Sequence, residues 1–213
     1  MTKIIIALLT FNRLDYSLLT IAAVREYLAR PAVAWYVADG GSTGENHAAV
    51  LDALRGEEVI GSHSVWQTAG ANWNAALRAC HAVSDVVLWL ENDWRLTQAL
   101  DLTPYVELLE RQATIGMVRF GGLAVGLRCE VTGYAGMHYL TMHRSAQYAY
   151  SGNPALRHRR FVEHYGYYNE TTNPGDTEID YDACFRASPG PEIVWPVECG
   201  WGWFGHAGTE KSY

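Results

Sequence analysis

Residues 85–94 read DVVLWLENDW, and this segment decides the fold class. Positions 85–90 are predicted to form a strand, and the continuous apolar run 86–90 is typical of a parallel strand buried on both faces of its sheet. The run passes directly into Glu91, Asn92 and Asp93. Because ligands of open parallel sheets bind beyond the carboxyl ends of the strands, the segment predicts a buried strand that presents acidic side chains to a ligand.

Strand-like and helix-like patterns alternate on the N-terminal side of this segment. The predicted strands are 3–9, 34–38 and 59–64, and the predicted helices are 15–30, 45–54 and 70–81. Alternation at this rhythm indicates βαβ units. We therefore expect an α/β fold with a mostly parallel sheet flanked by helices.

The rhythm breaks down after about residue 116. A strand at 117–120 and helices at 153–165 and 178–186 are the elements that the pattern still predicts. The remainder is rich in Tyr, His, Arg, Asn, Pro and Gly, without a linker, repeat or low-complexity segment. We expect a single domain, 1–213, whose C-terminal half is irregular.

Composition limits the class of protein. With 213 residues, 49% hydrophobic and 18% charged, the chain can bury a core without disulfides. Its four scattered cysteines are typical of reduced thiols, and the apolar run 4–9 is too short for a signal peptide or a membrane span. We expect a cytoplasmic protein without stable membrane association. The net charge of −7 argues against nonspecific nucleic-acid binding.

Two more polar clusters follow predicted strands. The first comprises Thr10, Phe11, Asn12 and Arg13, and the second is the turn DGGST, which begins at Asp39. A polar turn at one strand end has little meaning, because Asp and Gly favour turns for local reasons. Three such clusters, each after an apolar strand, together predict a ligand site.

In this order, the three clusters resemble the motifs of family-2-like GT-A glycosyltransferases. That family has a Thr-Phe-Asn-Arg type loop, an Asp-Gly-Ser-like turn and an Asp-x-Asp-like motif. The segment TAGANWN, 68–74, is similar to the family's Gly-x-x-x-x-Asn stretch, with Gly70 and Asn74 as the matching residues. The resemblance implies a Rossmann-like GT-A fold, with a nucleotide-sugar-binding half over 1–115 and an acceptor-side, catalytic half over 116–213.

The resemblance also implies a hexosyltransferase that uses a nucleotide-sugar donor, with a UDP-sugar favoured. Asp39 would hydrogen-bond a uracil-like imide, while the loop at Thr10 and Phe11 packs on the ring. Asp93 would bind Mn²⁺ or Mg²⁺, since hard cations take oxygen ligands. Glu91, in a motif that departs from Asp-x-Asp, would contact the donor sugar or reach the metal through water.

The C-terminal segment GHAGTEKSY, 205–213, resembles the His-x-Gly segment with which many GT-A enzymes complete metal coordination. The resemblance makes His206 a second metal ligand. Lys211 would contact the diphosphate.

An inverting transfer also needs a base to take the acceptor proton. The acidic segment DTEIDYD, 176–182, resembles the family's Glu-Asp motif at the head of a helix. Its spacing to Arg186 favours Asp180 as the base, with Glu178 as the alternative. Acids in a first helical turn are also favoured by the helix dipole alone, and inversion against retention stays open.

The acceptor is suggested only by analogy. Compact GT-A enzymes without a membrane anchor and with this type of tail resemble bacteriophage enzymes, some of which glycosylate 5-hydroxymethylated pyrimidines in viral DNA. The basic cluster RHRR, 157–160, would meet an anionic acceptor such as DNA, or form a solvated helix face. A polysaccharide, glycolipid or protein acceptor is the rival interpretation, and a catalytically inactive nucleotide-sugar-binding module is the alternative from another class.

Overall fold

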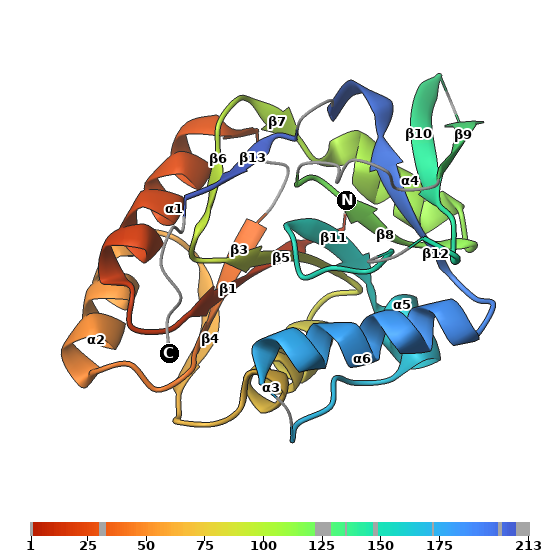
Figure 1. Cartoon of the computed structure of the whole chain (residues 1–213). Helices are drawn as coiled ribbons and strands as arrows, with labels where there is room; N and C mark the ends of the chain where they lie inside the picture. Colours follow the sequence, from red (N-terminus) through yellow and green to blue (C-terminus); the bar gives the residue numbers. More distant parts are fainter. Residues whose placement is uncertain are drawn as a thin grey trace.

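The computed structural model describes residues 2–29, 33–121, 129–134, 136–146, 149–171, 173–199 and 202–207 (Figure 1). A nine-stranded sheet runs through the molecule in the order β4-β3-β1-β5-β11-β8-β12-β10-β9. Its strands are β1 (Ile4–Thr10), β3 (Val33–Asp39), β4 (Val59–Ser64), β5 (Val86–Glu91), β8 (Ile115–Arg119), β9 (Cys129–Tyr134), β10 (Met137–Met142), β11 (Ala155–His158) and β12 (Glu192–Pro196).

The first four of these strands in sheet order, β4, β3, β1 and β5, are parallel. Strand β11 runs antiparallel between β5 and β8, whereas β12 is parallel to β8. Two small sheets pair β2 (Leu28–Ala29) with β7 (Leu100–Asp101) and β6 (Trp94–Leu96) with β13 (Phe204–His206). The central sheet thus contains strands from both halves of the chain.

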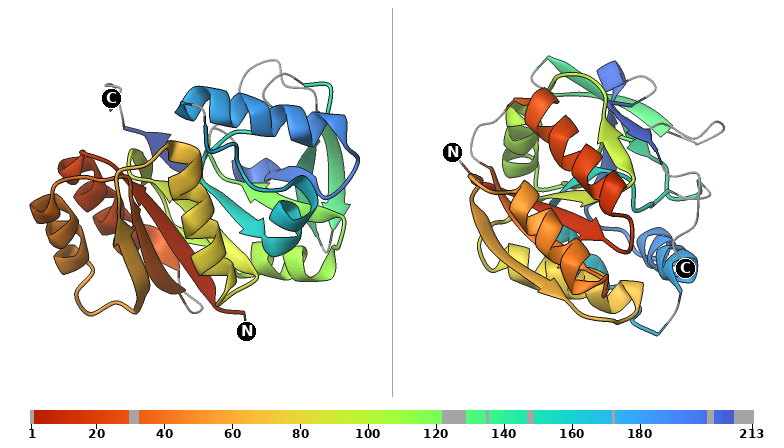
Figure 2. Two further views of the ribbon diagram at one scale, coloured as in Figure 1. Left: turned by 90° about the horizontal axis from the view of Figure 1, so that it is seen from below. Right: turned by 90° about the vertical axis from the view of Figure 1, so that its left-hand side faces the viewer.

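Helices cover both faces of the sheet (Figure 2). They are α1 (Leu14–Tyr27), α2 (Gly44–Ala53), α3 (Ala69–His81), α4 (Thr103–Arg111), α5 (Arg159–Tyr165) and α6 (Pro174–Ala187), with a short 3-10 helix, η1 (Val197–Cys199). Ile4, Ile6 and Leu8 of β1 pack in a core with α1, α2 and α4. The alternate residues of β1, beginning at Ile5, pack in a second core with α3, α5 and α6. Burial on both faces explains why the strand reads as a continuous apolar run.

The predicted α/β fold is confirmed, and the parallel strands lie close to their predicted positions. One prediction is wrong: residues 153–165 do not form a single helix, because Ala155–His158 is strand β11 and α5 begins only at Arg159. Ala155 and Leu156 are fully buried between β5 and β8, so tertiary pairing overrides the local helical pattern. The C-terminal half is also more regular than expected, since β8 to β12 extend the sheet.

None of the helices in the described ranges has the length and apolar character needed to cross a membrane.

Candidate functional site

Three parallel strands deliver the predicted polar clusters to one edge of the sheet. The register aligns Thr10 with Asp39 across β1 and β3, and Leu9 with Glu91 across β1 and β5. A cleft of about 370 Å³ opens at this edge. Its lining comes from the β1 and β5 ends, the segment before α3 and the start of α6, and includes Phe11, Arg13, Trp66, Glu91, Asp93 and Asn173.

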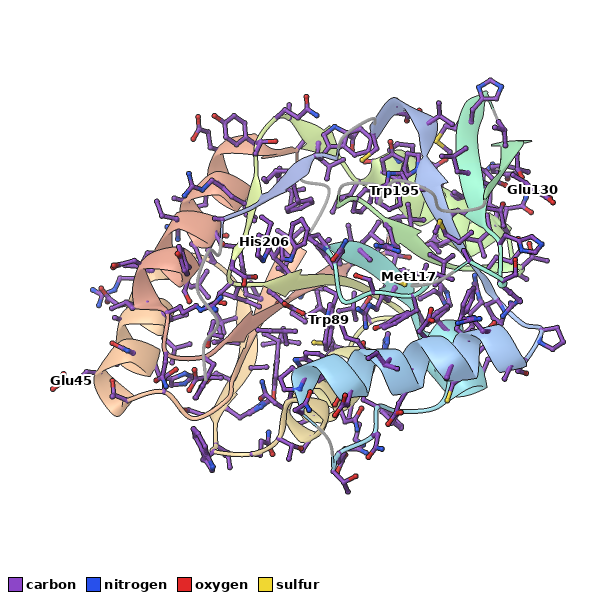
Figure 3. All side chains as sticks on the ribbon, viewed as in Figure 1. Glu45, Trp89, Met117, Glu130, Trp195 and His206 are labelled. Carbon is purple, nitrogen blue, oxygen red and sulfur yellow. The ribbon has the colours of Figure 1, made fainter. Side chains whose placement is uncertain are left out.

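Asp93, which lines the cleft, contacts His206. The β6–β13 pairing sets His206 opposite Trp94, and His206 Nε2 lies 3.4 Å from Asp93 Oδ2 (Figure 3). The same oxygen accepts a 2.7 Å hydrogen bond from Arg13 Nη1. The other carboxylate oxygen, Asp93 Oδ1, is buried without a hydrogen-bond partner in the described part of the chain. A buried carboxylate oxygen needs a partner.

The pair fits a divalent cation that takes its remaining ligands from elsewhere. Within the described ranges, no group of three or more His, Cys, Asp and Glu side chains could hold a metal. Asp93 and His206 would supply an oxygen and a nitrogen ligand, leaving positions for diphosphate oxygens and water. Mg²⁺ sites commonly have few protein ligands for this reason.

Glu91 and Glu178 form a carboxyl pair beside Gly152. The Gly152 N–H donates a 2.6 Å hydrogen bond to Glu178 Oε1. A Cβ on Gly152 would lie 2.2 Å from Glu178 Oε1 and 2.9 Å from Glu91 Oε1, so a glycine is required at this position. Burial and then the charge of Glu178 raise the pKa of Glu91 well above its ordinary value. Burial also raises the pKa of Glu178, against the lowering effect of the Gly152 hydrogen bond.

Asp180 does not reach this pair. Its Oδ2 accepts a 2.8 Å hydrogen bond from Asn169 Nδ2, and it is half-exposed. Two residues along a helix correspond to roughly 200° of rotation, so Glu178 and Asp180 point to nearly opposite sides of α6. The structure therefore brings Glu178, and not Asp180, next to Glu91.

The basic cluster 157–160 is divided between two elements, because Arg157 and His158 end β11 and Arg159 and Arg160 begin α5. Arg157 lies on β11, and its side chain is 4% exposed. Its guanidinium stacks 4.4 Å from the ring of Trp89, which is labelled in Figure 3, and it donates a hydrogen bond to the Tyr168 hydroxyl. Its positive charge lowers the pKa of both Glu91 and Glu178.

The other arginines of the cluster also bind the protein itself. Arg160 donates to the backbone carbonyls of Leu109 and Ile115, both at 2.7 Å. Arg159 pairs with Asp85 at 2.6 Å. Each of these arginines thus has a partner within the protein, and Arg159 keeps a partly exposed side chain.

Asp39 has a structural role in its turn. Its carboxylate, 1% exposed, accepts hydrogen bonds from the hydroxyls of Thr10, Ser42 and Ser64 and from the backbone N–H groups of Gly41 and Ser42. Burial works to raise the pKa of Asp39, but these hydrogen bonds outweigh it and lower the pKa. The carboxylate thus fastens the β3 turn to β1 and β4, and its contact with a base stays a prediction.

Gly70 and Asn74, expected at the donor, join α3 to the segment before α6. A Cβ on Gly70 would lie 2.0 Å from the Asn169 carbonyl oxygen, so glycine allows the two backbones to touch. Asn74 exchanges hydrogen bonds of 2.9 and 3.0 Å with the Tyr168 backbone. These contacts explain by packing why glycine and asparagine stand at positions 70 and 74, and a contact of either residue with the donor stays a prediction.

The remaining predicted residues have different environments. Thr10 lines the cleft while bonding Asp39 at 2.9 Å, and Arg13 pairs with Asp93. Asn12 is exposed at φ 50°, with its N–H bonded to Ser42 Oγ at 2.8 Å. Lys211 lies outside the described residues.

Two further residues line the cleft, Trp66 and Gln67, and neither was predicted from the sequence. Trp66 is 75% exposed, and its ring lies 5.4 Å from that of Phe11. Gln67 lines the cleft beside it. The sequence held no clear signal for Trp66, since single exposed apolar side chains are common on protein surfaces.

No family model matches the sequence, and no curated protein matches it. Solved structures do match. TarS of S. aureus, residues 1–349, is 14% identical with a TM-score of 0.64, over 91% of this chain and 57% of that one. The mannosyltransferase PcManGT of Pyrobaculum calidifontis, solved with GDP-Man and Mn²⁺, is 16% identical with a TM-score of 0.65, over 92% of this chain and 55% of that one.

GalNAc-T7, solved with UDP, GalNAc and Mn²⁺, is 12% identical with a TM-score of 0.65, over 93% of this chain and 43% of that one. The chain thus spans about half the length of these proteins. At such identities the likeness concerns the fold, which is the GT-A fold of glycosyltransferases.

Proposed function

We propose that this protein is a metal-dependent, inverting glycosyltransferase that uses a nucleotide diphosphate sugar, with a UDP-sugar favoured. The contact of His206 with Asp93, which lines the cleft, carries the proposal, because a buried Asp93 oxygen without a partner in the described part of the chain matches the need of a divalent cation. The UDP and GDP-sugar complexes of proteins that share the fold support the same class of donor.

In this proposal the cation, Mn²⁺ or Mg²⁺, neutralises charge that develops on the departing diphosphate. Asp93 and His206 hold it. Arg13, 2.7 Å from Asp93, orients the carboxylate and adds positive charge beside it. Phe11 and Trp66, whose rings lie 5.4 Å apart in the lining of the same cleft, suit a flat base.

We assign the base to Glu178, with Asp180 as the alternative that the geometry disfavours. Glu178 would take the proton of the acceptor hydroxyl while that oxygen bonds to the sugar carbon and the bond to the diphosphate breaks. A pKa raised toward neutral pH suits such a base. Glu91, next to Glu178 and lining the cleft, would contact the donor sugar.

Thermal unfolding with nucleotide diphosphates, with and without Mn²⁺, tests the donor site. A ligand at 100 times its Kd adds about 2.7 kcal/mol to the native state, or roughly 5–10 °C in Tm for a domain of this size. We expect a Mn²⁺-dependent shift with UDP that Asp93→Ala and His206→Ala each reduce, every variant being compared with its own ligand-free Tm. If no nucleotide shifts the wild type, the enzyme assignment is wrong.

Two matched substitutions on α6 test the base. We expect Glu178→Gln to lower kcat by about 10²–10⁴-fold with donor affinity unchanged. Asp180→Asn, two residues away, should keep kcat within a few-fold. The reverse result would move the base to Asp180.

The acceptor is the finer part of the proposal. A 5-hydroxymethylated pyrimidine of phage DNA offers a primary hydroxyl, but Arg159 and Arg160 of the cluster that favoured it contact the protein itself. Transfer assays should therefore set hydroxymethylated duplex and single-stranded DNA beside polysaccharide, glycolipid and protein acceptors. Transfer to DNA alone would establish the DNA acceptor, and transfer to another class alone would refute it.

The free thiols of Cys80, Cys184 and Cys199 support a cytoplasmic reaction.

A further inference from the structure

We propose that Gln67, and not Asp39, reads the edge of the donor's base, with its carbonyl oxygen accepting a hydrogen bond from a ring N–H. The site would then select a base of the uracil or guanine type, which carries such an N–H, over cytosine or adenine. This inference rests on the proposed function, in which the cleft holds a nucleotide.

Asp39 is already engaged. Both of its oxygens accept hydrogen bonds from its own turn and from Thr10 and Ser64. With 1% exposure, it would have to break these bonds and leave buried hydroxyls unpaired in order to meet a base. Another acceptor must therefore take the N–H of a base.

A chain of hydrogen bonds fixes which atom Gln67 offers. The Ala38 carbonyl can only accept, so the group of Asn72 that lies 3.4 Å away is the donating Nδ2. Asn72 Oδ1 must then accept, and it does so from His63 Nε2 at 2.6 Å and from Gln67 Nε2 at 3.4 Å. His63 Nδ1, the other ring nitrogen, accepts from the Tyr36 hydroxyl at 2.9 Å.

This polarity leaves the carbonyl oxygen of Gln67 as its acceptor. Gln67 lines the cleft, and within the described ranges no hydrogen bond reaches its Oε1. Rotating the amide by half a turn would bring two acceptor oxygens, those of Gln67 and Asn72, face to face. Because two facing acceptors repel, the amide of Gln67 keeps its Nε2 toward Asn72. The Ala38 carbonyl of β3 fixes this orientation through Asn72.

The aromatic pair supplies the face of the same subsite. Trp66 is 75% exposed beside Phe11, which is the exposure expected of a ring that a ligand covers. The backbone of Trp66 rests on Gly41, where a Cβ would lie 2.7 Å from Trp66 Cα and where φ is +100°. The Asp39 turn thereby positions the loop that carries both Trp66 and Gln67.

The chemistry discriminates between bases at one atom. Uracil N3 and guanine N1 carry a hydrogen that the Gln67 carbonyl can accept. Cytosine N3 and adenine N1 present a lone pair, which repels the same oxygen. UDP and CDP are otherwise close in shape, so the ratio of their affinities reports whether the Gln67 carbonyl oxygen faces the base. For a purine site, the ratio of the affinities for GDP and ADP gives the same information.

Calorimetric titration in Mn²⁺ of wild type, Gln67→Met and Trp66→Ala tests the inference. We expect the wild type to bind UDP about tenfold or more tightly than CDP. If the cleft takes purines instead, we expect the same preference for GDP over ADP. Gln67→Met should bring each pair within about twofold, and Trp66→Ala should weaken all nucleotides by roughly 5- to 100-fold. Binding of inorganic pyrophosphate should be unchanged in both variants.

A measurement on the wild type alone covers the case in which a variant misfolds. UDP methylated at N3 carries a methyl group in place of the proposed donor hydrogen, and we expect its affinity to fall to that of CDP or below it. Equal binding of UDP and CDP by the wild type, or a preference that persists in Gln67→Met, would overturn the assignment of Gln67 while leaving the donor site intact. Failure of the wild type to bind any nucleotide would overturn the proposed function together with this inference.

Discussion

Replacing Gly152 with alanine should displace Glu178 most and Glu91 to a smaller extent, at a distance from the Asp93 carboxylate and from the aromatic pair Phe11 and Trp66. The added Cβ would lie 2.2 Å from Glu178 Oε1, whereas ordinary contacts begin near 3.4 Å, so the carboxyl group must move by about 1 Å. Displacement also breaks the 2.6 Å hydrogen bond from the Gly152 N–H, a bond to a charged acceptor worth about 1.5–3 kcal/mol. A 1 Å error in a reacting group can cost about 100-fold in rate. We therefore expect kcat to fall by about 100-fold.

The assay is release of nucleotide diphosphate from the donor, with Kd for UDP and Mn²⁺ measured by calorimetry in parallel. Gly44→Ala is the matched control, because a Cβ there meets nothing within 4 Å. We expect Gly152→Ala to keep the wild-type Kd and lose kcat, and Gly44→Ala to keep both. An unchanged kcat in Gly152→Ala would refute the role given to Glu178, and a lost Kd would place Gly152 in the donor site instead.

Three further predictions concern stability in urea. Because the pKa of Glu91 is raised in the folded protein, the free energy of unfolding should fall as pH rises above about 4.3, the ordinary value for glutamate. Glu91→Gln should remove this loss, so that the substitution stabilises the protein more at pH 8 than at pH 5. Gly70→Ala should destabilise by about 1–3 kcal/mol relative to Gly44→Ala, despite the better helix propensity of alanine, since its Cβ meets the Asn169 carbonyl at 2.0 Å. Asp39→Ala should cost about 2–4 kcal/mol because the hydroxyls and N–H groups it binds lose their acceptor; a loss below 0.5 kcal/mol would contradict that role.

The parallel half of the fold could be predicted because its signal is local. Strands such as β1 and β5 are buried on both faces, so every residue must be apolar and the pattern needs no partner to be read. Strand β11 has the sequence ALRH, in which Arg157 would be taken for a surface residue. Its burial depends on Trp89 and Tyr168, which no local window contains.

The sequence predicted which strand ends form the site, but it did not predict which side chains point into it. The rule for parallel sheets placed Thr10, Asp39 and Glu91 at one edge, as their register shows. The choice between Glu178 and Asp180 required the phase of α6. That phase was present in the sequence as Asn173-Pro174, an N-cap followed by proline at the first helical position, and the Asn173 side chain does accept from Asp176 N at 3.0 Å.

Departures from the rules that favour stability gather around this cleft. Glu91 crowds Glu178 although like charges repel, Asp93 keeps a buried oxygen without a partner among the described residues, and Trp66 is exposed to solvent. Each costs free energy that a purely structural protein would recover by substitution, and a donor with its cation would relieve the last two at once. Because several such costs coincide at one sheet edge, they argue for function more strongly than any single motif does. The same reasoning explains why Gln67 could be found only in the structure: its meaning lies in the direction of a hydrogen-bond chain that begins at the Ala38 carbonyl, and sequence patterns carry no such direction.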